Sequence, residues 1–177
     1  MDKLIDDLIK LAFAEDIGDG DHTTLCCIPE TAMGKSQLII KEDGVLAGVE
    51  MAKRIFHDFD PELKMTVFIQ DGAEVKKGDI AFVVEGKIQS LLQTERLMLN
   101  VMQRMSGIAT TTRKYAKALE GTKTHVLDTR KTTPGMRMIE KEAVRIGGGM
   151  NHRIGLFDMI LLKDNHVDFA GAVSYTH

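Results

Sequence analysis

The segment from Val126 to His166 constrains the fold most, because it predicts a β-strand, an α-helix and a second β-strand in succession. Val126–Asp128 is short and apolar, and Met159–Leu162 is a continuous apolar run, as expected of a parallel strand buried on both faces. Between them, apolar residues recur at helical spacing, namely Met136, Ile139, Ala143 and Ile146. Charged residues lie off this stripe: Arg137, Glu140, Lys141, Glu142 and Arg145. Gly147-Gly148-Gly149 is expected to end the helix.

Polar residues follow both predicted strands and also precede the second one. In parallel α/β sheets and barrels, ligands bind at the carboxyl ends of the strands, so these side chains are expected to share one edge. They are Thr129, Arg130, Lys131, His152, Arg153 and Lys163. Four cations and a histidine at one edge indicate an anionic substrate with more than one negative group. The alternative is a set of solvated surface charges, which is the usual situation of Lys and Arg.

Several motifs of the sequence resemble those of a single enzyme family. The second half contains T-R-K-T-T-P-G, G-G-G-M-N-H-R and L-L-K-D-N-H, and the first half contains E-D-I-G-D-G-D-H-T-T and T-E-R-L-M-L-N with S-G-I-A-T. In this order they are similar to quinolinate phosphoribosyltransferase, also called nicotinate-nucleotide pyrophosphorylase (carboxylating). The resemblance extends from about Leu4 to Gly171. Five motifs in register make it far more specific than a single glycine motif.

The resemblance implies a fold in two parts. An α+β N-terminal sandwich domain is expected over residues 1–107, followed over residues 108–177 by the first part of an α/β barrel that carries the substrate-binding motifs. A complete barrel of this kind takes about 200 residues or more, so the barrel is expected to be incomplete, with a truncation at its C-terminal end. The acidic ligands of magnesium and the phosphate-binding loops of the family are then expected beyond residue 177.

The resemblance also implies a reaction. The pyridine nitrogen of quinolinate displaces pyrophosphate from phosphoribosyl pyrophosphate, accompanied by Mg2+, and decarboxylation gives nicotinate mononucleotide and CO2 for NAD biosynthesis. Lys131 and Lys163 are expected to be catalytic, as point charges that neutralise the leaving pyrophosphate or a carboxylate. Substrate binding is expected to involve Arg96, Thr129, Arg130, Lys131, His152, Arg153 and Lys163.

Arg96 has a special expected role in a homodimer or higher homo-oligomer. The resemblance implies that it reaches the active site of the other subunit and contacts the dicarboxylate, whereas an ion pair with Glu95 or a neighbouring helix is the alternative. Two other functions also remain open at this point. The protein could be an inactive fragment that serves at most as a binding or dimerisation module, or it could be the related paralogue associated with molybdenum transport.

Composition narrows the class of protein. A net charge of −3 gives no reason to expect nucleic acid or an anionic membrane as partner. Cys26 and Cys27 are adjacent, so they are poorly placed to form a disulfide with each other, and the sequence shows no zinc-binding spacing of Cys and His. The first residues are acidic and amphipathic rather than typical of a signal peptide, and no apolar run approaches membrane-spanning length. A cytoplasmic location is expected.

The first half of the sequence predicts helices and short strands. Helices are expected over residues 2–14 and 50–59, strands over 37–41, 45–49, 65–69 and 80–85, and a long helix from about Ser90 to Gly121 with a break at Ser106-Gly107. Residues 15–24, rich in Gly and Asp, are expected to form a loop. The hairpin around 71–79 also resembles biotin and lipoyl carriers, but Lys64 lies too close to it to be the modified lysine of that family.

Overall fold

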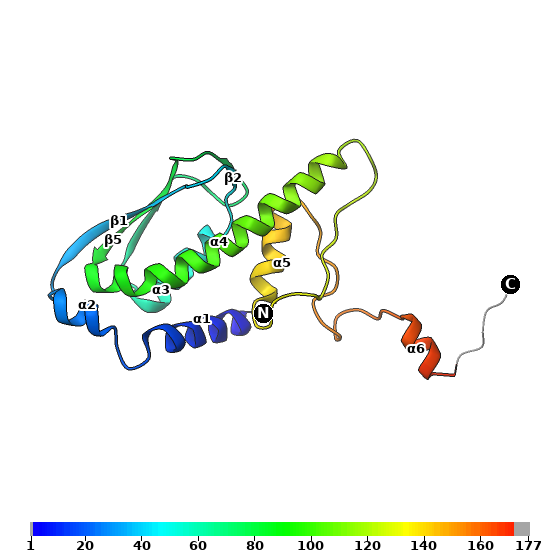
Figure 1. Cartoon of the computed structure of the whole chain (residues 1–177), viewed down its shortest axis with the longest axis horizontal. Coiled ribbons are helices and arrows are strands. Elements are labelled where there is room, and N and C mark those ends of the chain that lie inside the picture. Colours follow the sequence, from blue (N-terminus) through cyan, green and yellow to red (C-terminus); the bar gives the residue numbers. More distant parts are fainter. Residues whose placement is uncertain (1, 172–177) are drawn as a thin grey trace.

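The computed structural model describes residues 2–171, which are organised around one long helix, α4 (Ile88–Ala118) (Figure 1). An antiparallel sheet precedes it, with strands in the order β1 (Met33–Ile39), β5 (Ile80–Lys87) and β3 (Lys64–Val67). Helix α3 (Val49–Phe59) packs along α4, and the ring of its Phe56 meets Phe82 of β5 edge-on. These elements enclose the apolar core, in which Phe82, Ile55 and Met105 are almost completely buried.

The predicted N-terminal helix is confirmed, and a second helix begins within the predicted loop. Helix α1 (Asp2–Ile17) is longer than predicted, and its Phe13 packs on Phe59 with ring centroids 5.0 Å apart. The loop predicted over residues 15–24 is wrong at both ends, because α1 extends into it and α2 (His22–Cys27) begins inside it. Asp21 caps α2, since its carboxylate accepts a hydrogen bond of 3.0 Å from the backbone N–H of Thr24.

The predicted strands are confirmed in part. Strands β1, β3 and β5 lie at three of the predicted positions, but the strand predicted over residues 45–49 is wrong. Only β2 (Gly44–Val45) forms there, paired with β4 (Glu74–Val75), and α3 begins at Val49. The helix starts this early because the Asp71 carboxylate accepts hydrogen bonds from the backbone N–H groups of Val49 and Glu50, at 2.8 and 3.3 Å.

The predicted break at Ser106-Gly107 is also wrong, because α4 continues through it without interruption. Gly107 destabilises the helix only because glycine loses more backbone entropy on folding than other residues do. The core contacts of Met102, Met105 and Ala109 on either side compensate for that loss. The Ser106 hydroxyl is bonded to the backbone of Ala47 rather than breaking its own helix. The division of the protein into domains at residue 107 remains a prediction.

The predicted strand–helix–strand unit forms only in part: its helix is present, but within the described residues the strand predicted over Val126–Asp128 is reduced to one bridging residue, and the strand predicted over Met159–Leu162 is absent. Helix α5 (Arg137–Ile146) is confirmed, and Gly148, with φ of +95°, takes the left-handed conformation that ends it. The glycines turn the backbone round at once, so that Leu127 pairs in parallel with Met150. Met159–Leu162, predicted as the second strand, is not a strand, and its side chains are 37–91% exposed.

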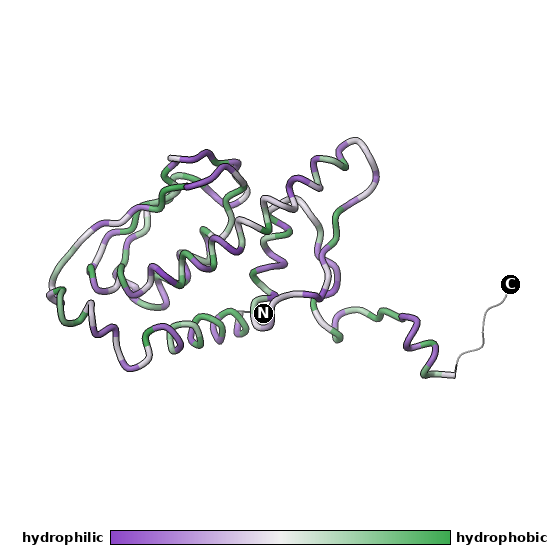
Figure 2. The backbone as a smooth tube through the Cα atoms, viewed as in Figure 1, coloured by the Kyte–Doolittle hydropathy of each residue, from purple (hydrophilic) through white to green (hydrophobic). Residues whose placement is uncertain are grey.

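Residues 155–171, the C-terminal arm, extend away from the rest of the protein and contain α6 (Asp164–Phe169) (Figure 1). Figure 2 shows apolar stretches along this arm, and its Phe157, Ile160 and Phe169 side chains are 85–92% exposed. Residues 172–177, the end of the predicted barrel segment, lie outside the described residues. Within residues 2–171, none of the helices combines the length and apolarity that a membrane crossing requires.

Candidate functional site

Two segments that carry predicted site residues lie together beside α5. The first site segment is residues 128–132 and the second is residues 150–154. They leave the Leu127–Met150 bridge side by side, because the Met150 N–H donates to Val126 O at 2.8 Å and the Asp128 N–H donates to Met150 O at 3.2 Å. The parallel pairing therefore brings Thr129–Lys131 and His152-Arg153 to the same end of the unit, as expected for strand ends in an α/β sheet.

A buried ion pair joins the two segments to α5. Lys141, only 2% exposed, donates from its ammonium group to Asp128 Oδ1 and to the backbone oxygen of His152, the latter at 3.1 Å. The same Asp128 oxygen accepts the backbone N–H of His152 at 2.8 Å. The amide of Asn151, with its nitrogen turned toward these acceptors, adds bonds of 2.8 Å to Asp128 Oδ2 and to Lys141 O. The backbone of the second site segment is thus fixed against the first.

Arg137, at the start of α5, links the same two segments a second time. Its guanidinium donates to the Thr132 hydroxyl at 3.1 Å, to Ile154 O at 3.0 Å and to Arg130 O at 3.4 Å. Because a guanidinium offers five donors in a rigid plane, one side chain can hold three acceptors in fixed positions. The backbone oxygens of Arg130 and Ile154 therefore lie within hydrogen-bonding distance of one group.

A further pair supports the turn that follows the first site segment. Arg104 of α4 donates to Glu140 of α5 at 2.8 and 3.0 Å and to the Thr133 hydroxyl at 3.1 Å. Burial of Glu140 disfavours its charged form, but the hydrogen bonds from Thr133 and Arg104 outweigh burial and hold the pKa of this carboxyl below its ordinary value. Glu140 therefore stays ionised and fastens α5 to α4.

Arg130 is the predicted site residue whose surroundings are most informative. Its side chain is half-buried, and its Nε is buried without a hydrogen-bond partner among the described residues. Buried polar groups in native proteins are nearly always paired, so an unpaired guanidinium N–H is a position at which an external acceptor would be favoured. Arg153 is 6% exposed and uses one donor for Met159 O at 3.2 Å.

The other residues of the two segments are more open. Thr129 and Lys131 are exposed, and the Thr129 hydroxyl accepts the backbone N–H of Lys131 at 3.1 Å. His152 is half-buried. Five of the seven predicted site residues are therefore brought together: Thr129, Arg130, Lys131, His152 and Arg153.

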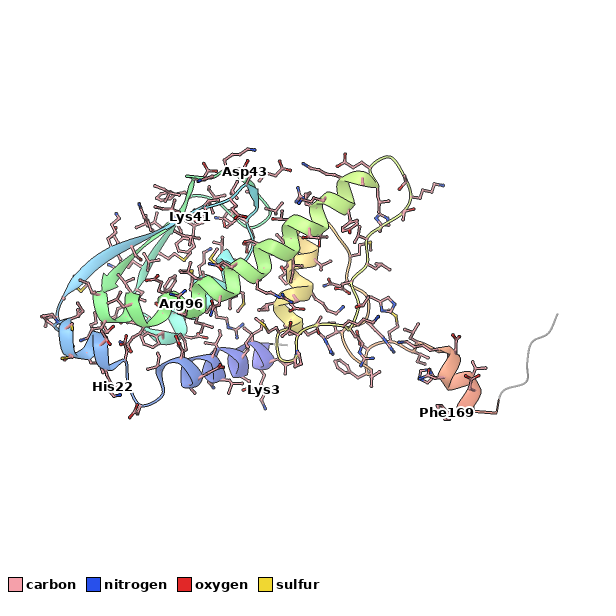
Figure 3. The ribbon with its side chains drawn as sticks, viewed as in Figure 1. Lys3, His22, Lys41, Asp43, Arg96 and Phe169 are labelled. Atoms are coloured by element: carbon pink, nitrogen blue, oxygen red, sulfur yellow. The ribbon has the colours of Figure 1, made fainter. Side chains whose placement is uncertain are left out.

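Lys163 and Arg96 are not part of this group. Lys163 was expected at the end of a second strand, but without that strand it is exposed on the C-terminal arm, where its N–H donates to His166 Nδ1 at 3.1 Å. Arg96 is exposed on α4, well apart from the end of the arm at Phe169 (Figure 3). The alternative pairing of Arg96 with Glu95 does not occur within the described residues, where Arg96 has no hydrogen-bond or ion-pair partner.

Sequence reasoning overlooked the residues that support the site, above all Asp128, Arg137 and Lys141. Arg137 and Lys141 lie off the apolar stripe of α5, but they are four residues apart and so share one face of the helix. That spacing, next to a helix face expected to be buried, is the signal that could have identified them.

The described surface also has a groove of about 760 Å3 between β1, β2 and α4. Its lining includes Leu38, Val45, Leu99 and Met102, and none of the predicted site residues. The volume of this groove alone would favour a different site, so the choice of candidate site depends on the chemistry of the two site segments.

Two family models match the sequence. The model of the quinolinate phosphoribosyl transferase N-terminal domain matches residues 21–106, and that of the C-terminal domain matches residues 108–176. Quinolinate phosphoribosyltransferase (decarboxylating) 1 of Nicotiana glauca is 49% identical over 168 residues, which are 94% of this chain and 47% of that protein. The chloroplastic nicotinate-nucleotide pyrophosphorylase (carboxylating) of Oryza sativa subsp. japonica is 48% identical over 168 residues, 94% of this chain and 45% of that protein.

A solved structure shows the same likeness in three dimensions. NadC from Streptococcus pyogenes superimposes with a TM-score of 0.91 at 42% identity, covering 98% of this chain and 61% of its own. This likeness confirms the predicted fold class, an α+β domain followed by the first part of an α/β barrel. The protein spans about half the length of the curated relatives it matches.

Proposed function

The chain belongs to the quinolinate phosphoribosyltransferase family, and we propose that residues 128–132 and 150–154 form the quinolinate-binding part of a phosphoribosyltransferase site. The observation that carries the proposal is the buried, unpaired Nε of Arg130, beside a second arginine whose backbone is fixed on the neighbouring segment. Guanidinium groups bind carboxylates through charge-assisted and often bidentate hydrogen bonds. Quinolinate offers two carboxylates, and the two arginines lie on the two site segments that leave the Leu127–Met150 bridge side by side.

Each residue of the site has a proposed role. Arg130 and Arg153 hold the carboxylates, and His152 donates a further hydrogen bond. Lys131 supplies a positive charge near the reacting pyridine ring, where it favours the negatively charged groups that gather during phosphoribosyl transfer. Thr129 orients the backbone of Lys131 through the bond from its N–H. Lys163 joins this set only when the C-terminal arm folds over the site, and Arg96 only from another subunit.

The overall reaction proposed is that of the family: quinolinate and phosphoribosyl pyrophosphate give nicotinate mononucleotide, CO2 and pyrophosphate. The names of the relatives support quinolinate as substrate over the alternative of a molybdenum-associated paralogue. Within residues 2–171 the structure has no group of three or more His, Cys, Asp or Glu side chains placed to hold a metal ion. Magnesium is proposed only as the companion of phosphoribosyl pyrophosphate.

Assembly and location belong to the same proposal. A homodimer or higher homo-oligomer is proposed because Arg96 is exposed and unpaired within the described residues, and belongs to α4 rather than to either site segment. A cytoplasmic location is proposed as well. The rice relative is named chloroplastic, so fractionation of cells that produce the protein decides between the two locations.

Quinolinate binding by the purified protein tests the proposal. Arg130→Ala removes a charge-assisted hydrogen bond of about 1.5–3 kcal/mol, so the dissociation constant from titration calorimetry should rise about tenfold to a hundredfold. Arg145→Ala is the matched control, because Arg145 carries the same charge but is exposed and paired with Glu142. Equal affinity of Arg130→Ala and the unaltered protein would contradict the assignment. Tighter binding of nicotinate than of quinolinate would instead indicate a site for a monocarboxylate.

A further inference from the structure

We propose that the buried Asp128–Lys141 pair is a positioning device that holds His152 and Arg153 in place for an aromatic dicarboxylate. The inference rests on the proposed function and extends it, because neither member of the pair was expected to take part in the site. Asp128 and Lys141 act through the backbone of the second site segment and not by touching substrate.

The pair holds one residue from both sides. Asp128 Oδ1 accepts the N–H of His152 at 2.8 Å, and the Lys141 ammonium donates to the carbonyl oxygen of the same residue at 3.1 Å. The ammonium also contacts that same Asp128 oxygen, so the three groups form a closed ring of hydrogen bonds. With both of its backbone polar groups bound, His152 cannot rotate about its backbone without breaking a bond to a buried charge.

Arg153 lies between two fixed points. On one side, His152 is held by the ion pair, and on the other, Ile154 O is held by the Arg137 guanidinium at 3.0 Å. The same guanidinium binds Arg130 O at 3.4 Å. The spacing between Arg130 and Arg153, which sets the distance between two carboxylates that they can bind together, is therefore determined by side chains of α5.

The use of charges for this purpose is itself informative. Lys141 and Asp128 have side chains only 2% and 7% exposed, and a buried ion pair contributes little net stability compared with apolar residues of the same size. What such a pair provides that an apolar pair does not is direction, because its hydrogen bonds fix the groups around it. A role in positioning therefore explains the burial of two charges better than a role in stability.

The experiment separates positioning from stability by removing one or both charges. Lys141→Met leaves the Asp128 carboxylate buried without its countercharge. This variant should therefore unfold at a clearly lower urea concentration. In the double variant Asp128→Leu/Lys141→Met both charges are gone, so stability should recover in large part, short of the unaltered protein because the N–H and C=O of His152 have lost their partners. Quinolinate binding by the double variant should nevertheless be at least about tenfold weaker, since small displacements of binding groups cost that much or more.

An exposed ion pair provides the matched control. Glu74→Leu/Lys117→Met makes the same kind of replacement at a pair whose side chains are more than half exposed, and it should leave quinolinate affinity unchanged. Unaltered affinity in Asp128→Leu/Lys141→Met would overturn the proposal, because the site would then be in order without the pair.

Hydrogen exchange gives a second readout that needs no substrate. In the unaltered protein the His152 amide is bonded to Asp128 and should exchange slowly. In the double variant it should exchange at least about tenfold faster than the difference in global stability accounts for. If the unaltered protein does not bind quinolinate at all, the proposed function fails, and the exchange rate alone then decides on the pair. Equal protection of His152 in both proteins would overturn the positioning role.

Discussion

Replacing Gly147 by alanine is expected to destabilise the protein through a steric clash between α5 and α4. Gly147 has φ of −70° and ψ of −8°, a conformation open to alanine, so backbone strain makes no contribution. An added Cβ would lie 2.6 Å from Ala109 O and 2.7 Å from Thr112 Cβ, and the carbonyl belongs to the backbone of α4 and cannot turn aside. Overpacking of this kind destabilises the folded state by about 1–3 kcal/mol. Alanine also lowers the conformational entropy of the unfolded chain, which offsets about 0.4–1 kcal/mol of that loss. The net loss is about 1–2 kcal/mol.

Gly107→Ala is the matched control, because it makes the same chemical change with the opposite expected sign. Gly107 lies inside the exposed part of α4, and an added Cβ there would have no heavy atom within 4 Å. Alanine should stabilise the helix by about 0.5–1 kcal/mol. Urea unfolding followed by circular dichroism measures both variants. Equal stability of Gly147→Ala and the unaltered protein would refute the close α4–α5 contact on which the site depends, and destabilisation by Gly107→Ala would refute the continuous helix.

Three further outcomes follow from the same structure. Ser106→Ala leaves the N–H and C=O of the fully buried Ala47 without their partner, and should lower the free energy of unfolding by about 1–3 kcal/mol, whereas Thr111→Ala, on the exposed side of α4, should lower it less. The pKa of Glu140 lies below its ordinary value of 4.5, so the ionised carboxylate stabilises the protein above pH 4.5 and this contribution is lost as the pH falls through the lower folded pKa. The difference in free energy of unfolding between the unaltered protein and Glu140→Gln, measured by urea titration, should therefore shrink below about pH 4.5. Mixing subunits that carry Arg96→Ala with subunits that carry Arg130→Ala should restore about a quarter of the quinolinate sites if each site of a homodimer takes Arg96 from the partner, and a calorimetric stoichiometry of zero would contradict a shared site.

The elements that were predicted correctly are those whose periodicity reports burial directly. Helices α3 and α5 have apolar residues at helical spacing, and the core contains Ile55 and Phe56 of the first and Ile139 and Ala143 of the second. Met159–Leu162 shows the limit of this reasoning. A short apolar run indicates that a segment is suited to burial under other parts of a protein. A strand also needs a neighbouring strand to pair with, and none of the described residues forms such a pairing with this run.

The residues that we propose to face the ligand were predicted from the sequence, whereas the residues that support them were not. Arg130 and Arg153 follow from the rule that polar residues at strand ends gather at one edge, which depends only on topology. Lys141 could not be assigned in the same way, because a lysine between charged neighbours is usually exposed, and its partner Asp128 is 13 residues away in the sequence. Only the three-dimensional return of the backbone at Gly147–Gly149 places the two charges together and buries them.

The cations of the candidate site differ in how firmly the fold holds them, and this difference bears on how the site would operate. The backbone at Arg130 and on both sides of Arg153 is tied to α5 through Arg137 and the Asp128–Lys141 pair, so the backbone positions from which the two arginines extend are held by the fold. Lys163 lies on an arm whose large apolar side chains are mostly exposed. Hydrogen bonds from Arg153 to Met159 O and from the Ile154 N–H to the Asp158 carboxylate join the start of that arm to the site. Under the proposed function, binding a dicarboxylate therefore requires little reorganisation of the backbone. Any step that needs Lys163 requires the arm to pack closer to the site. Ordering the arm costs about 1–2 kcal/mol per residue, which other contacts must offset. If the proposed function holds, quinolinate affinity should therefore depend mainly on the supports from α5, and turnover should depend on the ordering of the arm.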